Sequence, residues 1–391
     1  IIAEGPTLIN GGAWANSFFG DGIRSVTVQD GATIINETHT FGGLGAALYQ
    51  PSITLESGSR WILAGEQYLS ANNLTLDGGT VEIEADEDLR MQGGTCLVNA
   101  TDGGSVIEGA GFVRLFGAVT FDVADGAAAG DLQINTPINE SNSQSLTKAG
   151  DGTLVLSGDA SHTGETLVDA GTLELTDTAA LSGTSLVRIA AGAEVDATAA
   201  GLALGAGQAV GGDGTLDGNA ILGGGAVSPG EVVGALSVTG DLALGEGSSY
   251  NWQVTDWTAA AGTGYDTVSA DTLTFSATEG APFTVFVSED MLVNYDGSET
   301  TFTLVSTANG ITGFDPLAVA VDATAFTSGF GDWVVSVSGN DLVLTFTEGG
   351  DPYLAWETAN GIGGAGPTAD SDGDGVDNCI EFVIGGDPNG T

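Results

Sequence analysis

The residues best suited to chemistry lie near the C-terminus, in the segment ADSDGDGVDNCIEF. Aspartates occupy alternate positions, a glycine follows the third of them, and a glutamate comes close to the end. Calcium-binding loops use this spacing, because the hard cation prefers six to eight oxygen ligands and the glycine permits a sharp turn. We predict a Ca²⁺ ion bound by the carboxylates of Asp370, Asp372 and Asp374, the carbonyl of Val376, Asn378 and both oxygens of Glu381.

The elements around this segment are short. Asp351 and Pro352 favour the start of a helix that carries Tyr353, Leu354 and Trp356. A glycine-rich stretch over 361–369 follows, and a second helix is predicted over 378–384. The alternative to an ion site is an acidic turn, which would leave four carboxylates crowded together without compensation. We therefore expect calcium to fold this tail.

Other candidates for chemistry are weaker. The segment GGDGTLDG at 211–218 lacks the aspartate that a stacked calcium repeat needs, so a plain turn is favoured. His39 and His162 stand alone on turn-like sequence, where we expect exposed histidines. A polysaccharide lyase needs a basic residue beside calcium, and Arg60, Arg90 and Arg114 lie about one to two repeats apart, a spacing that would let them line one face. We favour neutralisation of stacked acids over that role and predict that the chain is not an enzyme.

Charge is the strongest global feature. The 391 residues include 52 acidic and 6 basic ones, for a net charge of −46, and no lysine or arginine follows Arg188. Nucleic-acid binding requires clustered lysine and arginine, so this partner class is excluded. No apolar stretch is long enough for a membrane-spanning segment. Cys96 and Cys379 are remote from each other in sequence, and two isolated thiols are favoured over a disulfide.

A five-residue sequence motif recurs along the middle of the chain. Apolar and polar residues alternate in it, and glycine, aspartate or asparagine follows each copy, which is typical of short strands and turns. Gly152-Thr-Leu and Gly171-Thr-Leu are 19 residues apart, and Gly214-Thr-Leu follows 43 residues later, close to two further periods. A period of about 20 residues indicates one coil of a β-solenoid, in which each coil buries its apolar row on the next.

We divide the chain into four parts. Residues 1–145 keep the same pattern less clearly and are interpreted as irregular N-terminal coils, with a β-sandwich as the alternative. Residues 146–249 hold the repeats. Residues 250–348 carry larger aromatic side chains and longer strands, which predict an antiparallel, sandwich-like cap that closes the C-terminal end of the rod. Residues 349–391 form the calcium-loop tail.

The segment from Leu146 to Leu175 resembles the autotransporter-associated β-strand repeat, and 226–242 resembles the closing coils of the same family's passenger domains. The resemblance covers about 100 residues. It implies a right-handed parallel β-helix that is secreted, often bound to the surface of a Gram-negative-type bacterium, and without enzymatic residues. The tail resembles the calcium loops of EF-hand and dockerin proteins. The expected fold class is thus all-β, a right-handed parallel β-helix with an antiparallel cap and a short helical tail.

Three functions follow from this interpretation. The leading hypothesis is a rigid acidic rod that builds or displays an extracellular layer or filament. The apolar start Ile1-Ile2 favours end-to-end self-association, in which a neighbour's strand completes an open coil. The second hypothesis is an adhesin that binds glycans through exposed aromatic residues, for which Trp14, Trp61 and Trp257 are the candidates. The third, a glycan-cleaving enzyme on a β-helix, is the least favoured.

Overall fold

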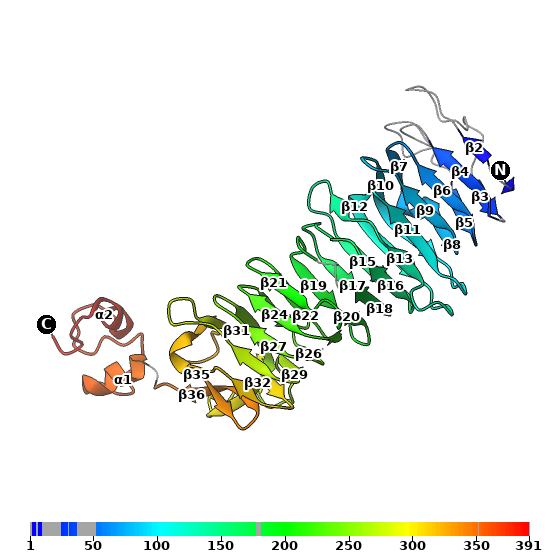
Figure 1. Cartoon of the computed structure of the whole chain (residues 1–391). Coiled ribbons are helices and arrows are strands. Elements are labelled where there is room, and N and C mark those ends of the chain that lie inside the picture. The colour runs from blue at the N-terminus through cyan, green and yellow to red at the C-terminus, as the bar shows by residue number, and fades with distance from the viewer. Residues whose placement is uncertain are drawn as a thin grey trace.

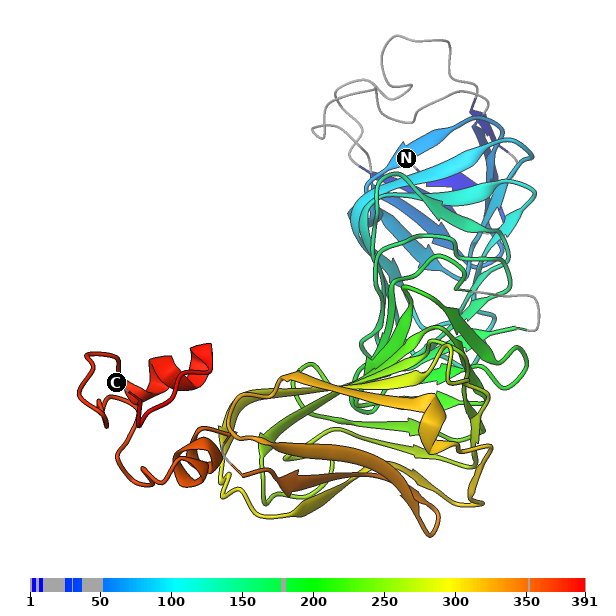
Figure 2. The same cartoon turned by 90° about the vertical axis from the view of Figure 1, so that its left-hand side faces the viewer.

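A computed structural model describes residues 2–4, 7–9, 25–29, 31–36, 52–176, 181–350 and 352–390. For 2–4 and 7–9 it describes the backbone alone. The chain forms a long rod of stacked strands, followed by a small helical tail at one end (Figure 1). The same rod seen from the side shows strands wrapped around a common interior, with the tail beyond the last coils (Figure 2).

In the described residues two sheets, here called sheets A and B, run along the rod, and a third, sheet C, extends only from Leu202 to Thr312. In the described part of the chain, sheet A has 16 strands. In order along the rod they are β1 (Ile2–Glu4), β3 (Ser25–Gln29), β5 (Ser52–Glu56), β8 (Leu74–Asp77), β10 (Asp88–Val98), β12 (Phe112–Val123), β15 (Leu146–Ala149), β17 (Thr166–Val168), β19 (Leu186–Ile189), β22 (Ala209–Gly212), β25 (Ala226–Pro229), β28 (Ser249–Asp256), β31 (Phe283–Val293) and β34 (Val319–Ala325), with β7 (Gln67–Leu69) and β14 (Ile138–Glu140) beside them.

Sheet B has 15 strands in the described residues, and sheet C has five. Sheet B holds β2 (Thr7–Ile9), β4 (Thr33–Asn36), β6 (Arg60–Leu63), β9 (Thr80–Ile83), β11 (Ser105–Gly109), β13 (Leu132–Ile134), β16 (Thr153–Leu156), β18 (Thr172–Leu175), β20 (Glu194–Asp196), β23 (Thr215–Asp217), β26 (Ala235–Val238), β29 (Thr267–Ala270), β32 (Thr300–Thr307), β36 (Asp341–Glu348) and β35 (Gly331–Ser338). Sheet C holds β21 (Leu202–Gly205), β24 (Ala220–Gly223), β27 (Leu242–Leu244), β30 (Leu273–Phe275) and β33 (Ile311–Thr312).

In the part of the chain that the structure describes, the helices are few and short. Two 3₁₀ turns, η2 (Ala71–Asn73) and η3 (Pro316–Ala318), lie within this part of the rod. The helices α1 (Pro352–Ala359) and α2 (Asn378–Ile384) form the tail.

Each coil places its apolar residues over those of the previous coil. Leu154 pairs with Leu173, Leu173 with Val195, and Val195 with Leu216, and all four are buried. Gly214-Thr-Leu thus lies two coils beyond Gly171-Thr-Leu, which confirms the period inferred from the sequence. Parallel pairing with an uninterrupted apolar interior confirms the right-handed parallel β-helix. A single coil would bury little, so the stack supplies the stability.

The described sheet strands of residues 1–145 lie on the same sheets as the repeats. Strand β12 pairs in parallel with β15, and β13 pairs in parallel with β16. The ladders between named strands are parallel throughout this described region, which is the pairing of a solenoid and not of a β-sandwich.

The C-terminal end differs from the expected cap. Strands β28, β31 and β34 continue sheet A in parallel, and β29 and β32 continue sheet B, so the solenoid passes the boundary predicted at residue 249. Among the described strands, antiparallel ladders join only β32 to β36 and β36 to β35. The cap is therefore a short antiparallel addition to the last coils.

Aromatic side chains fill these last coils. Trp257 contacts Phe302 at 5.0 Å and Phe346 at 5.2 Å between ring centroids, and Trp252 contacts Phe302 at 5.1 Å. Most contacts are edge-to-face, the geometry that aromatic quadrupoles favour. The larger residues after 249 thus fill the interior of the last parallel coils and of the short antiparallel addition.

Candidate functional sites: the acidic loop and a charged ladder on sheet A

The acidic loop lies between the two tail helices. Their aromatic residues form a small core, in which Phe382 contacts Tyr353 at 5.6 Å and Trp356 at 5.7 Å between ring centroids. This core joins the start of α1 to the end of α2 and brings both ends of the loop together.

Backbone N–H groups shape the loop around its first aspartate. Asp370 Oδ1 accepts from Gly373 N at 2.7 Å, and Asp370 Oδ2 accepts from Gly375 N at 2.9 Å. Gly375 has φ 92°, a backbone conformation that glycine adopts without strain. The predicted sharp turn at Gly375 is confirmed, and it gathers carboxylate oxygens of Asp370, Asp372 and Asp374 within 4.8 Å of one another.

Glu381 supplies a second feature of the loop. Its side chain is only 4% exposed, and its Oε2 is buried without a hydrogen-bond partner, as is Asp372 Oδ2. Burial raises the pKa of Glu381, and the charges of Asp372, Asp374 and Asp370 raise it further. A buried carboxylate oxygen that faces other carboxylates and lacks a donor fits a hard divalent cation.

The remaining predicted ligands are placed differently. Asn378 is buried, its Oδ1 accepts from Ser371 N at 3.2 Å, and its Nδ2 donates to Ser371 Oγ at 3.0 Å. In this structure the amide therefore closes the loop. Val376 donates its N–H to Asp374 Oδ1 at 2.8 Å, and metal binding by its carbonyl stays a prediction.

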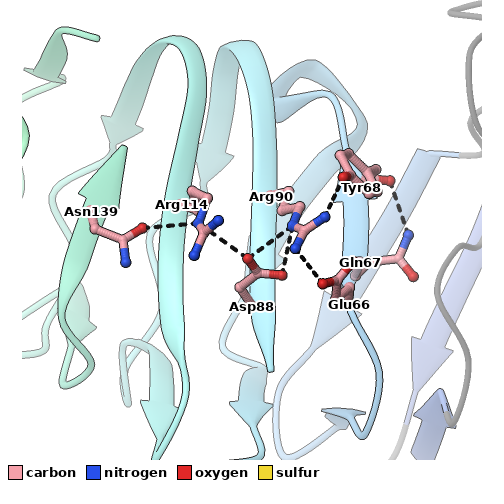
Figure 3. A network of polar contacts seen from close by, with 7 residues as sticks. All are labelled: Glu66, Gln67, Tyr68, Asp88, Arg90, Arg114 and Asn139. Carbon is pink, nitrogen blue, oxygen red and sulfur yellow. Dashed lines mark hydrogen bonds and ion pairs between the residues drawn. The ribbon is translucent and has the colours of Figure 1, made fainter. Parts of the chain in front are cut away.

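A second polar cluster lies on the outer face of sheet A, on strands β7, β10, β12 and β14 (Figure 3). We call it the charged ladder. Asp88, which is 2% exposed, lies 2.8 Å from Arg90 Nε and 3.2 Å from Arg114 Nε. Arg90 also pairs with Glu66 and donates to the Tyr68 hydroxyl.

Strand register explains why the ladder forms. Tyr68 pairs with Arg90, Arg90 with Arg114, and Arg114 with Asn139, so one outward position repeats over four strands. Arg114 Nε lies 3.3 Å from Asn139 Oδ1, its hydrogen-bond acceptor. Nothing local in the sequence links these residues, because the coils that bring them together differ in length.

The arginines considered for lyase chemistry do not share a face. Arg60 lies on β6 of sheet B and pairs with Glu82, whereas Arg90 and Arg114 lie on sheet A. The idea that all three line one surface was therefore wrong. All three arginines form ion pairs with carboxylates, as neutralisation of stacked acids predicts.

The tryptophans proposed for glycan binding are also unsuitable where the structure describes them. Trp61 is fully buried and Trp257 is 3% exposed, so both belong to the rod's interior. Trp14 lies outside the described residues. Trp61 lies on β6 and Trp257 directly follows β28, and the sequence alone did not decide which way either side chain points.

His162 corrects another expectation. It is fully buried, and its Nε2 lies 2.9 Å from Thr166 Oγ1, which lies 3.0 Å from Thr184 Oγ1 in the next coil. Burial lowers the pKa of His162, against the opposing charges of Glu140 and Asp159. His39 lies outside the described residues. Cys96 and Cys379 are both free thiols.

A shallow groove of about 450 Å³ on the outer face of sheet A was not anticipated. Arg188 spans it and pairs with Glu165 and with Glu231, which lies two coils further on. Asp169 and Asp213 also line it. Asp213 belongs to the segment GGDGTLDG, which runs from the end of β22 into β23 as a turn and a strand.

Comparison with known proteins finds a family match for a small part of the chain. Residues 146–175 match the family described as Passenger-associated-transport-repeat. This match and the parallel solenoid fit the passenger domain of an autotransporter, a repeat family that is typically not catalytic. A search of curated proteins finds no match to the chain. Among the described residues, no helix has the length and apolar character needed to cross a membrane.

Proposed function

We propose that this chain is a secreted or surface-exposed structural protein, a rigid acidic β-solenoid rod whose tail is braced by calcium. The main support for this proposal is the continuous apolar interior of the rod, which extends from Val26 to the aromatic cluster around Phe346. Such a core resists bending, and its side chains pack one coil against the next. The passenger repeat at 146–175 supports export to the cell surface.

Calcium bracing rests on the tail's own geometry. Three aspartates share one side of the loop, and the buried Glu381 adds an oxygen that lacks a donor. A bound Ca²⁺ would offset the repulsion among these carboxylates and link α2 to the loop.

Calcium titration of the full chain tests this proposal by isothermal calorimetry. We expect a saturable site that the substitution Glu381→Gln weakens by at least about tenfold, since loss of groups that merely support metal ligands already has that effect. Asp377→Asn is the matched control, because it removes the same charge from a residue whose side chain makes no cap to α2. Equal weakening in both variants would indicate diffuse attraction to an acidic surface and contradict a built site.

Self-association of the rod is the finer part of the proposal. Strands β34 and β35 end sheets A and B, and side chains near this end are apolar and exposed, including Leu317, Phe330 and Val334. Exposed strand edges with apolar neighbours favour pairing with another chain. With a net charge of −46, association requires salt or calcium to screen repulsion. Electron microscopy at high salt and millimolar calcium that shows only single rods would reject this part.

A further inference from the structure

Three aromatic rings accompany the charged ladder on the outer face of sheet A. The Arg90 guanidinium lies 4.7 Å from the ring centroid of Tyr68, and that of Arg114 lies 4.9 Å from Phe112. The ring of Phe116 meets that of Tyr68 edge-on at 5.6 Å. Phe116 is 36% exposed.

A β-bulge aims Phe116 at this position. Met91 pairs with Leu115 and Gln92 with Gly117, so Phe116 is the extra residue of β12 opposite β10. Gly93 and Gly94, beside the bulge, have φ values of 84° and 98°. Bulges redirect side chains and are over-represented next to functional sites. A ladder that served only to neutralise charge would need neither the bulge nor the exposed ring.

The patch also presents hydrogen-bond donors in a fixed orientation. Among the described residues, Arg114 bonds through Nε to Asp88 and Asn139, and no side chain accepts from its terminal nitrogens. Buried Asp88 holds both guanidiniums in place. Planar donors held rigidly beside aromatic rings offer a fixed set of hydrogen bonds next to apolar surface.

We propose that this aromatic–guanidinium patch, made of Tyr68, Phe112, Arg114, Phe116 and Asn139, binds a neutral polysaccharide. The exposed ring of Phe116 packs against the C–H face of a sugar, and Arg114 and Asn139 donate to its hydroxyl oxygens. The ligand is neutral because Asp88 and Glu66 offset the charges of Arg90 and Arg114, and the surrounding acids repel a polyanion. This inference goes beyond the structural role, since a rod can be rigid without binding glycans.

Affinity electrophoresis of the full chain tests the proposal. The probes are a soluble β-1,3-glucan, an arabinoxylan and a galactomannan, with polygalacturonate as the anionic comparator. We expect at least one neutral polysaccharide to retard the protein, and Phe116→Ala to weaken that binding about tenfold. Arg114→Lys keeps the charge but loses the planar donors, and a severalfold loss is expected.

The control variant is Phe286→Ala. Phe286 is 43% exposed on the same sheet, outside the patch, so its loss should leave binding unchanged. The proposal is overturned if no neutral probe retards the protein, if polygalacturonate alone does so, or if both phenylalanine variants behave alike. Calcium titration of the same variants separates this outcome from the fate of the proposed structural role, because the tail is untouched.

Discussion

The rod and the tail hold their shapes by different means. In the rod, side chains such as Leu173 and Trp252 are fully buried, and each inner coil lies between two others. In the tail, Ile380, Val383 and Ile384 of α2 are largely exposed, and buried Glu381 faces other acids. A repeated stack can accumulate apolar burial coil by coil, whereas segments of about 40 residues are small and usually need a metal, a disulfide or a partner.

The largest effect is expected from a change in the rod. Leu173→Ala removes side-chain volume from the column between Leu154 and Val195, and should lower the free energy of unfolding by about 2–5 kcal/mol. Denaturant unfolding followed by circular dichroism measures this. The matched control is Ile221→Ala, since Ile221 is 53% exposed on β24 and should change stability by less than about 0.5 kcal/mol. Equal losses would deny that inward rows support the stack.

Removal of calcium by a chelator should destabilise the tail and leave the stability of the rod unchanged. Calcium at 100 times its dissociation constant stabilises a binding unit by about 2.7 kcal/mol, and this increment should be confined to the tail. Limited proteolysis with and without chelator, read by mass spectrometry, would show cleavage between 361 and 377 only when calcium is removed. Cleavage that instead spreads through the coils would mean that the ion braces the whole molecule.

A charge placed at the C-terminal end should act on assembly and leave folding intact. Val334→Asp puts a carboxylate on an exposed position of β35 and adds to the repulsion between rods. Sedimentation at high salt with calcium should show assemblies of the unmodified chain. Assemblies of the variant should have a dissociation constant about tenfold higher. Ile221→Asp adds the same charge to the side of the rod and should have little effect. A larger effect of Ile221→Asp than of Val334→Asp would mean that rods associate through their sides.

The smallest effect concerns acid. Burial lowers the pKa of His162 below the ordinary value of 6.5, so the unfolded chain binds a proton more readily than the folded one. Stability should be unaffected above pH 6.5 and should fall as the pH drops from 6.5 toward the folded pKa, with a slope of at most about 1.4 kcal/mol per pH unit. The unfolding midpoint of the unmodified chain, compared with His162→Gln between pH 8 and 5, isolates this slope. Parallel slopes would mean that His162 titrates normally.

The coils were predictable because a solenoid demands the same residue type at the same inward position. One position of the repeat holds Thr153, Thr172 and Glu194, which pair in succession. Each comes immediately before a buried aliphatic residue, so the repeats can be aligned from the sequence alone. The acidic turn was predictable for a similar reason, since its geometry depends on local spacing around Gly375.

Features that depend on contacts between coils were not predictable. His162 sits in turn-like sequence, yet it is fully buried beside Thr166, whose hydroxyl in turn contacts Thr184 of the following coil. The bulge at Phe116 had a faint local signal in Gly93-Gly94, but its pairing with Tyr68 depends on two intervening coil lengths. After residue 249 the shift to large aromatic residues suggested antiparallel strands, because alternation is the same in both kinds of sheet and composition does not report strand direction.

The parallel ladders have a mechanical consequence. Strands lie across the rod, so the hydrogen bonds between successive coils point along its length. A force that pulls the two ends apart loads one ladder at a time, and the coils peel away singly. Each coil of about 20 residues releases roughly 70 Å of extended chain when it opens. Under tension the rod would therefore lengthen one coil at a time and absorb work, while remaining stiff against sideways load.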